Sequence, residues 1–227
     1  MPVIVFASSK GGVGKSTTAL AFAQTLHWSK YSVHLLDADP NGPMRAWQKL
    51  TEAQGTLPNN FKVFSGLSET NIIEQIQTSA ESSQFVIVDL EGSANLAVSY
   101  AINEADLVLI PCQGSQLDAN EAAKIISTIN RSEKQMRRKI PFAVCFTRTT
   151  YVKSRTNKHI FRLFGEQNIP TIEVEVAERD AFKALFTFGG MLHQLTQDEV
   201  SSPEKAILNM NEFCRAAIAF LKENQNV

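Results

Sequence analysis

Two lysines and three glycines lie within nine residues, in the stretch SKGGVGKST at 9–17. Three glycines let a backbone fold tightly, so that successive N–H groups point inward around an anion. Where such a loop opens a helix it binds phosphate oxygens, with the lysine on the β- and γ-phosphates and the serine on Mg²⁺. The alternative is a glycine-rich turn without a ligand. We predict that this loop binds a nucleotide through Gly11, Gly12, Val13, Gly14, Lys15, Ser16 and Thr17.

Three aspartates follow apolar runs elsewhere in the chain. Asp37 and Asp39 lie in LLDADPN at 35–41, and Asp89 lies in FVIVDLEGS at 85–93. An aspartate that closes an apolar strand beside a phosphate loop holds Mg²⁺ directly or through water. Each aspartate alone is also a common residue in turns after strands. Together they predict a metal site in which Asp89 is the principal residue, formed by Ser16, Asp37, Asp39 and Asp89.

The rest of the chain has the elements that would bring these loops together. Short β-branched runs recur at 3–7, 32–37, 61–64, 85–89, 107–111, 142–147 and 172–176. Stretches of helical period separate them, near 16–28, 43–54, 69–80, 95–103, 117–130, 156–167 and 203–223. This alternation predicts an α/β fold with a mostly parallel, twisted sheet of about seven strands and helices on both faces. FKVF at 61–64 and IEVEV at 172–176 alternate in polarity, which favours positions near the sheet edges.

We expect residues 1–227 to form a single domain, since neither a repeat nor a Pro/Gly-rich linker interrupts the pattern. In such sheets ligands bind beyond the carboxyl ends of the strands, where the loops named above lie. The net charge of −1 does not indicate nucleic acid or an anionic membrane. The three cysteines are far apart and form no C-x-x-C pair, which argues against zinc or disulfides and favours the cytoplasm. Apolar runs are strand-sized, so no membrane association is expected.

The phosphate loop departs from the strict G-x-x-x-x-G-K-[ST] pattern, because Ser9 stands where its first glycine is expected. The form K-G-G-x-G-K-[ST] resembles the deviant Walker A box of the ParA/MinD family of P-loop ATPases. The resemblance implies ATP and Mg²⁺ as ligands and a nucleotide-sandwich homodimer, in which Lys10 crosses to the phosphates of the partner chain. It also implies that Asp39, in Asp37-Ala38-Asp39-Pro40, positions the attacking water. The implied catalytic residues are Lys10, Lys15 and Asp39.

The resemblance covers nearly the whole chain. Trp47 and the segment at 111–122 fit small partition ATPases, and 178–195 is similar to the ParA-type ATPase of the crown-gall T-DNA transfer system. That ATPase recruits a processed DNA complex to a type IV secretion apparatus. Two departures affect the predicted switch geometry: Leu90-Glu91-Gly92-Ser93 replaces a proline-rich segment, and Asn41 replaces glutamine. With the first strand at residue 3, an N-terminal helix-turn-helix extension is not expected.

Basic residues supply candidates for non-specific DNA binding, because the family assembles a basic surface when it dimerises on ATP. We predict DNA contacts from Arg148, Lys153, Arg155, Lys158, Arg162, Arg179 and Lys183. Thr147 and Arg148 are also candidates for contact with the adenine ring. A second cluster, Arg131, Lys134, Arg137, Arg138 and Lys139, is equally consistent with a solvated surface. Phe182, Phe186 and Phe188 are expected in the core, and the four histidines show no metal-ligand spacing.

These features predict an ATP-dependent dimeric switch with slow hydrolysis, stimulated by a ParB-like or other adaptor protein. The switch would bind DNA non-specifically, associate with the nucleoid and drive plasmid or chromosome partition or cargo positioning. A second candidate function is recruitment of a relaxosome or DNA-transfer complex to a type IV secretion system. The phosphate loop is also compatible with a MinD-like membrane-positioning ATPase, a small-molecule P-loop ligase or an iron–sulfur ATPase. These three have less support. The last helix has few basic residues, which disfavours the membrane role, and the cysteines lack a cluster-forming pair, which disfavours the iron–sulfur ATPase.

Overall fold

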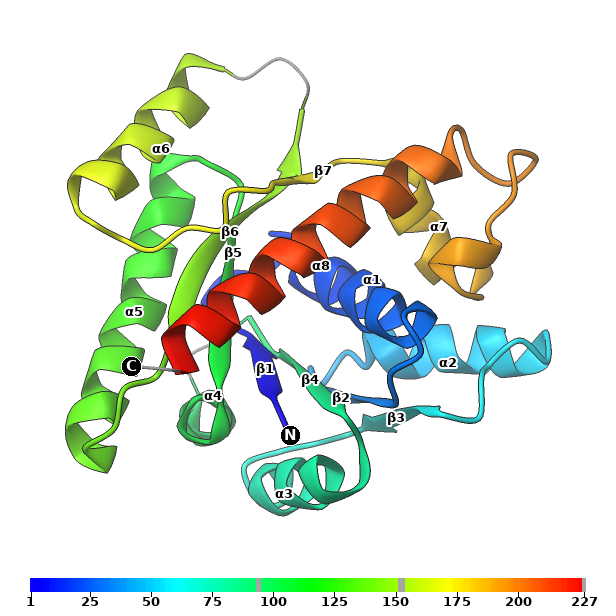
Figure 1. The fold of residues 1–227 in the computed structure, drawn as a ribbon, viewed down its shortest axis with the longest axis horizontal. Coiled ribbons are helices and arrows are strands. Elements are labelled where there is room, and N and C mark those ends of the chain that lie inside the picture. Colours follow the sequence, from blue (N-terminus) through cyan, green and yellow to red (C-terminus); the bar gives the residue numbers. More distant parts are fainter. Residues whose placement is uncertain (93–94, 151–153, 226–227) are drawn as a thin grey trace.

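The computed structural model describes residues 1–92, 95–150 and 154–225. Seven parallel strands form one sheet in the order β3-β2-β4-β1-β5-β6-β7, as Figure 1 shows. This confirms the predicted parallel sheet, and the two alternating runs do lie at its edges. The strands are β1 (Val3–Phe6), β2 (Val33–Ala38), β3 (Phe61–Ser65), β4 (Phe85–Leu90), β5 (Leu107–Cys112), β6 (Phe142–Thr149) and β7 (Val176–Ala177).

Helices cover both faces of the sheet. The helices α1 (Lys15–Trp28), α2 (Pro43–Ala53), α7 (Asp180–Phe188) and α8 (Pro203–Gln225) share one hydrophobic cluster with one face of the strands. The helices α3 (Ile72–Ser82), α4 (Leu96–Glu104), α5 (Gln116–Met136) and α6 (Arg155–Glu166) share the other. Alternate strand residues enter the two clusters, so that Ile4 and Phe6 face α1 while Val3 and Val5 face α4 and α5. A short 3₁₀ helix, η1 (Leu192–Gln194), follows α7.

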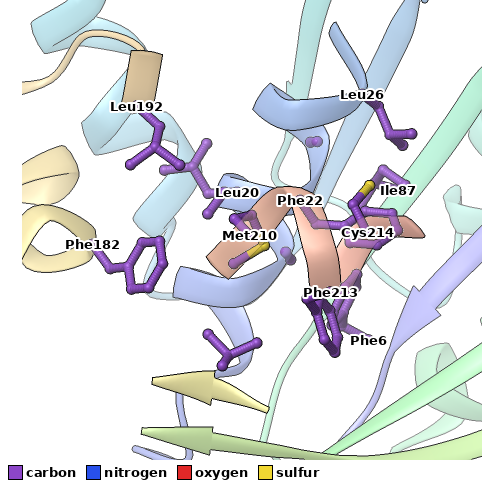
Figure 2. Close-up of a cluster of buried hydrophobic side chains, with 14 of the residues drawn as sticks. Phe6, Leu20, Phe22, Leu26, Ile87, Phe182, Leu192, Met210, Phe213 and Cys214 are labelled. Carbon is purple, nitrogen blue, oxygen red and sulfur yellow. The ribbon is translucent and has the colours of Figure 1, made fainter. Parts of the chain in front are cut away.

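The helix α8 is an integral part of the first layer. Figure 2 shows Phe22 of α1, Phe6 of β1 and Phe213 of α8 in one hydrophobic cluster. The ring centroids are 5.6 Å apart for Phe6 and Phe22 and 6.0 Å apart for Phe22 and Phe213, both in edge-on geometry. Met210 and Leu221 are buried on the same side of α8. None of the helices in the described part of the chain combines the length and the apolar character needed to cross a bilayer.

Two elements differ from the sequence-based prediction. The strand expected at 172–176 is reduced to Val176–Ala177, because it pairs with β6 across a bulge between Thr147 and Thr149. The helix α7 was not among the predicted helices, although the phenylalanine spacing around it was recognised as nearly helical. Phe182 is buried, as expected, and Phe186 is partly buried. The prediction was wrong for Phe188, which ends α7 and is 46% exposed.

The turn after α7 is fixed against α2. Gly189 has a φ of 80°, and a Cβ there would lie 2.7 Å from Cβ of Leu50. The carbonyl of Gly190 accepts a hydrogen bond from Nε1 of Trp47 at 2.9 Å. The N–H of Gly190 donates to the Thr51 hydroxyl at 3.0 Å. Buried polar groups of α2 therefore hold this turn in place.

A stacked pair at the end of α1 leads to a prediction about pH. The Trp28 and His193 rings stack at 4.5 Å, and burial lowers the pKa of His193 to about 4. Between about pH 6.5 and pH 4 the unfolded chain binds more protons at this site, so stability is lost as the pH falls. His193→Phe keeps an aromatic ring against Trp28 but cannot bind a proton. Between pH 6.5 and pH 4 we expect its free energy of unfolding to fall by about 2–3 kcal/mol less than that of wild type.

The measurement is chemical denaturation of both proteins at pH 6.5 and pH 4. An identical pH dependence for wild type and His193→Phe would show that the His193 imidazole titrates normally.

Candidate nucleotide-binding site

The phosphate loop joins β1 to α1 and presents backbone donors at the start of that helix. Gly14 is the N-cap residue, with a φ of 87°, and Gly12 has a φ of 79°, both in the region that favours glycine. No side chain caps α1 and no acidic residue lies in its first turn. The first N–H groups of the helix and its positive end are therefore open to an anion.

Lys15 forms a buried ion pair with the aspartate near the end of β4. Its Nζ lies 2.8 Å from Oδ1 of Asp89, and the two side chains are 6% and 0% exposed. Burial raises the pKa of Asp89, while the Lys15 ammonium and the Ser16 hydroxyl oppose that shift. Among the residues that the structure describes, none forms a hydrogen bond with the buried Oδ2 of Asp89. A buried charge with one unsatisfied oxygen is costly, which indicates that this position is built for a further ligand.

This arrangement fits Mg²⁺ bound together with phosphate. The Ser16 hydroxyl lies near the Asp89 carboxyl group, and both supply oxygen ligands of the kind Mg²⁺ prefers. Across the described ranges, no three side chains of His, Cys, Asp and Glu come together as a metal cluster. Mg²⁺ would therefore take its remaining ligands from phosphate oxygens and water, as it does in nucleotide sites.

Asp37 lies beneath the site rather than in its wall. It is fully buried, and its two oxygens accept the N–H groups of Asp39 at 3.1 Å and Met44 at 3.0 Å. Burial, followed by the nearby Asp89, raises the pKa of Asp37 to about 6. Asp39 itself lines the cavity, and one of its oxygens accepts both the backbone and the side-chain N–H of Asn41 at 2.9 Å. Asp37 thus holds the backbone that places Asp39.

A cavity of about 380 Å³ extends from the phosphate loop to β7 and α7. It brings Lys10 and Asp39, from the loops after β1 and β2, together with Arg148 near the end of β6. Two predicted contact residues lie behind the wall, because Val13 and Thr147 are buried and the Thr147 hydroxyl donates to the Val13 carbonyl at 2.6 Å. The predicted residues that line the cavity are Lys10, Gly11, Gly12, Gly14, Lys15, Ser16, Thr17, Asp39, Arg148, Arg179 and Lys183.

Lys10 lies at the mouth of the cavity, where it forms an ion pair with an acidic residue of the same chain. Its Nζ lies 2.9 Å from Oδ1 of Asp118, and the two side chains are 43% and 3% exposed. The Ser9 hydroxyl donates to Oε2 of Glu121 at 2.6 Å, one turn further along α5. The sequence-based prediction missed both acidic residues. Their position just after the end of the fifth strand, at the same sheet edge as the loop, was the available signal.

Gly92 shows how the segment after β4 contacts the phosphate loop. A Cβ at this position would lie 2.9 Å from the Gly11 nitrogen and 2.9 Å from the Lys10 carbonyl carbon. Only glycine fits there without moving the backbone. We expect Gly92→Ala to weaken ATP binding by roughly tenfold, equal to about 1.4 kcal/mol of binding free energy, as measured by isothermal titration calorimetry.

The matched control is Gly165→Ala, because a Cβ at Gly165 in α6 meets no atom within 4 Å. Unchanged affinity in Gly92→Ala would mean that the segment moves away from the loop when nucleotide binds.

Arg148 joins the phosphate loop to the far wall of the cavity. It has a φ of 53° and lies on the β6 bulge, and its Nη1 donates to the Gly12 carbonyl at 2.9 Å. Its Nη2 and Nζ of Lys183 lie 3.1 Å and 3.0 Å from the same Glu178 oxygen. Phe182 adds an apolar surface to this end of the cavity. The position suits a nucleobase, and Glu178 and Phe182 were not predicted from the sequence.

The residues predicted to contact DNA fall into separate groups. Arg148, Arg179 and Lys183 line the nucleotide cavity. Arg155, Lys158 and Arg162 lie exposed along α6, at a spacing that places them on one side of the helix. Arg162 also contacts Glu166, with Nε 3.5 Å from Oε1. Lys153 lies outside the described residues.

The chain is similar to known proteins over nearly its whole length. The family model described as VirC1 protein matches residues 1–224. The chain is 38% identical to Protein ParA of Rhizobium radiobacter, over 98% of this chain and 99% of that protein. It is 27% identical to Protein virC1 of Rhizobium radiobacter, over 93% of this chain and 91% of that protein. Among solved structures, an ATP complex of a Cyanothece McdA variant has a TM-score of 0.71 at 19% identity, covering 95% of this chain and 96% of that one.

Proposed function

The chain belongs to the VirC1 family, among the ParA/MinD-type P-loop ATPases, and on this premise we propose that it is an ATP-dependent dimeric switch. The observation that carries the proposal is the pair of lysines in one loop, which have different surroundings. Lys15 is buried against Asp89, whereas Lys10 stands at the cavity mouth with 43% of its side chain exposed. This difference supports a role for Lys15 on phosphates bound by its own chain and a role for Lys10 outside that chain.

ATP would lie along the cavity, with its phosphates on the loop backbone and Lys15 and its base near Arg148 and Phe182. Bound Mg²⁺, held by Ser16 and Asp89 with support from Asp39, would neutralise charge on the β- and γ-phosphates. Of the Asp37 and Asp39 pair, Asp39 is the one that lines the cavity, and it would position the attacking water. Asp37 would keep Asp39 in place through its hydrogen bond to the Asp39 backbone N–H.

Lys10 would act on the partner chain. Two copies that meet over their nucleotides would each insert Lys10 toward the other's phosphates, supplying positive charge where negative charge develops. Lys10 must first leave Asp118, whose carboxylate also accepts the Ser115 hydroxyl at 2.6 Å and is therefore not left without a partner. The dimer would then hydrolyse ATP slowly, faster when a ParB-like or other adaptor protein stabilises the closed site.

Dimerisation would also create the DNA surface. The α6 cations Arg155, Lys158 and Arg162 would contact phosphates from both subunits, which fixes no base sequence. Arg179 and Lys183 would join them at the cavity rim. Such a protein would work in the cytoplasm, on the nucleoid while ATP is bound, and drive partition of DNA or positioning of a cargo. Release after hydrolysis would give the cycle its direction.

VirC1 family membership favours a second candidate function, recruitment of a DNA-transfer complex to a type IV secretion system. The same switch would serve it with a different cargo. A MinD-like membrane role has less support, because Met210, Phe213 and Leu221 turn the apolar side of α8 into the core.

A gel-shift experiment with duplex DNA of arbitrary sequence tests the proposal. Three α6 cations on each of two subunits predict a salt slope of roughly −5 for the ATP-dependent part of binding. This corresponds to a loss of roughly 10³ in affinity between 50 and 200 mM salt. Equal affinity with ATP, with ADP and without nucleotide would contradict the switch.

A further inference from the structure

The second basic cluster occupies the end of α5 that is remote from the nucleotide. Figure 1 shows α5 running along one side of the molecule to its end beyond Met136. The first turn of this helix holds Lys10 through Asp118, and 21 helical residues extend about 30 Å. The cluster therefore lies at the other end of α5 from the phosphate loop.

The charges of this cluster are only partly neutralised by the protein itself. Glu133 is the one acidic residue within 131–139, and its two oxygens accept the Ile140 N–H at 2.9 Å and Lys139 Nζ at 3.2 Å. Arg138 donates to the carbonyls of Asn103 and Ala105, which ties the segment to the end of α4. In the described part of the chain no acidic group forms an ion pair with the three remaining cations: Arg131, Lys134 and Arg137.

These three cations follow one another along the helix and its end. Arg131 and Lys134 are exposed and three residues apart, so that they share one side of α5, and the exposed Arg137 follows directly at the C-cap of the helix. Beside these cations lies a hollow of about 470 Å³ whose lining includes Lys134, Arg137, Arg138 and Lys139. We refer to Arg131, Lys134, Arg137, Arg138 and Lys139 as the α5 patch. Its charge contrasts with the net charge of −1 for the whole chain.

We propose that the α5 patch is a second DNA-binding site, which contacts the phosphate backbone of duplex DNA independently of nucleotide. A small anion is disfavoured here, because the carbonyl end of a helix carries partial negative charge. A long polyanion such as duplex DNA is favoured, because each contact between a cation of the patch and a phosphate releases a counterion from the DNA. The lining of the hollow contains no aromatic ring, so it lacks a platform on which unpaired bases could stack.

Such a site would keep the protein near DNA after ATP hydrolysis. The ATP-dependent surface on α6 would release the DNA. The α5 patch would remain in weak contact with it, so that the protein could rebind nearby. In the dimer, two α5 patches would also allow contact with a second duplex. This inference concerns the nucleotide-free chain and does not depend on dimerisation.

Fluorescence anisotropy of labelled duplex DNA with nucleotide-free protein, across a salt series, tests the inference. The test variant is Arg131→Gln/Lys134→Gln/Arg137→Gln, which should shift the salt slope by roughly three units and weaken binding at 50 mM salt at least about tenfold. The matched control, Lys49→Gln/Lys62→Gln/Lys205→Gln, removes the same charge from exposed positions elsewhere. It should stay within about twofold of wild type.

Three results would overturn the inference. These are equal weakening in both triple variants, no DNA binding by nucleotide-free wild type, and tighter binding of poly-glutamate than of DNA with the same number of charges. Lysine acetylation gives a second readout that needs no variant: duplex DNA should protect Lys134 and Lys139 but not Lys62. ATP-dependent dimerisation should persist in the test variant, so failure of this site and failure of the switch are separable.

Discussion

Lys15→Ala is expected to lose ATP binding and to destabilise the fold at the same time. Lys15 supplies the charge for the phosphates, and its loss should weaken ATP affinity by roughly 100-fold. It also neutralises Asp89, which is 0% exposed and already has one unpartnered oxygen. Removing one partner of a buried ion pair costs about 3–5 kcal/mol. Calorimetric titration with ATP and denaturant unfolding measure the two effects separately.

The double variant Lys15→Met/Asp89→Asn separates binding from stability. It removes both charges, so we expect it to recover most of the lost unfolding free energy while ATP binding stays absent. If Lys15→Ala unfolds at the wild-type denaturant concentration, the 2.8 Å contact between Lys15 and Asp89 does not carry the energy assigned to it.

Lys10→Ala is expected to bind ATP normally and to lose partner-stimulated hydrolysis. Within its own chain Lys10 contacts Asp118 rather than the loop backbone, so ATP affinity should stay within about twofold. A positive group delivered in trans contributes roughly 10³-fold or more to phosphoryl transfer, and the stimulated rate should fall accordingly. The stimulated rate is measured by phosphate release with DNA and the adaptor protein present.

Mixing two inactive variants tests whether the lysine acts on the partner chain. In a dimer of Lys10→Ala with Asp39→Ala, one site has both its own Asp39 and the partner's intact Lys10. An equal mixture should regain about a quarter of wild-type activity, because half of the dimers are mixed and each has one complete site. No recovery would show that Lys10 acts within its own chain.

The sequence was sufficient for the parts of the site that lie in consecutive residues. A strand, a glycine-rich loop and a helix start are local features, so the phosphate loop could be placed without knowledge of the fold. The aspartates at strand ends could be placed as well, because parallel strands bring their carboxyl ends to one edge. Asp37 shows the limit of this reasoning, since only the structure reveals that its oxygens bind backbone N–H groups.

Contacts between distant segments could not be predicted from the sequence. Asp118 binds Lys10 across 108 residues, and Gly92 touches the loop from the end of another strand. The short edge strand β7 was also overestimated, because polarity alternation in IEVEV does not reveal the bulge at Arg148 that limits pairing. These features depend on how elements meet in space, which propensity and periodicity do not contain.

Light scattering on a sizing column tests the ATP-dependent dimer most directly, with Asp39→Ala used to block hydrolysis. With saturating ATP and Mg²⁺ we expect a species of twice the 25.1 kDa chain mass, returning to one chain mass when ADP replaces ATP. A constant mass of 25.1 kDa for Asp39→Ala at saturating ATP and Mg²⁺ would contradict the dimeric switch.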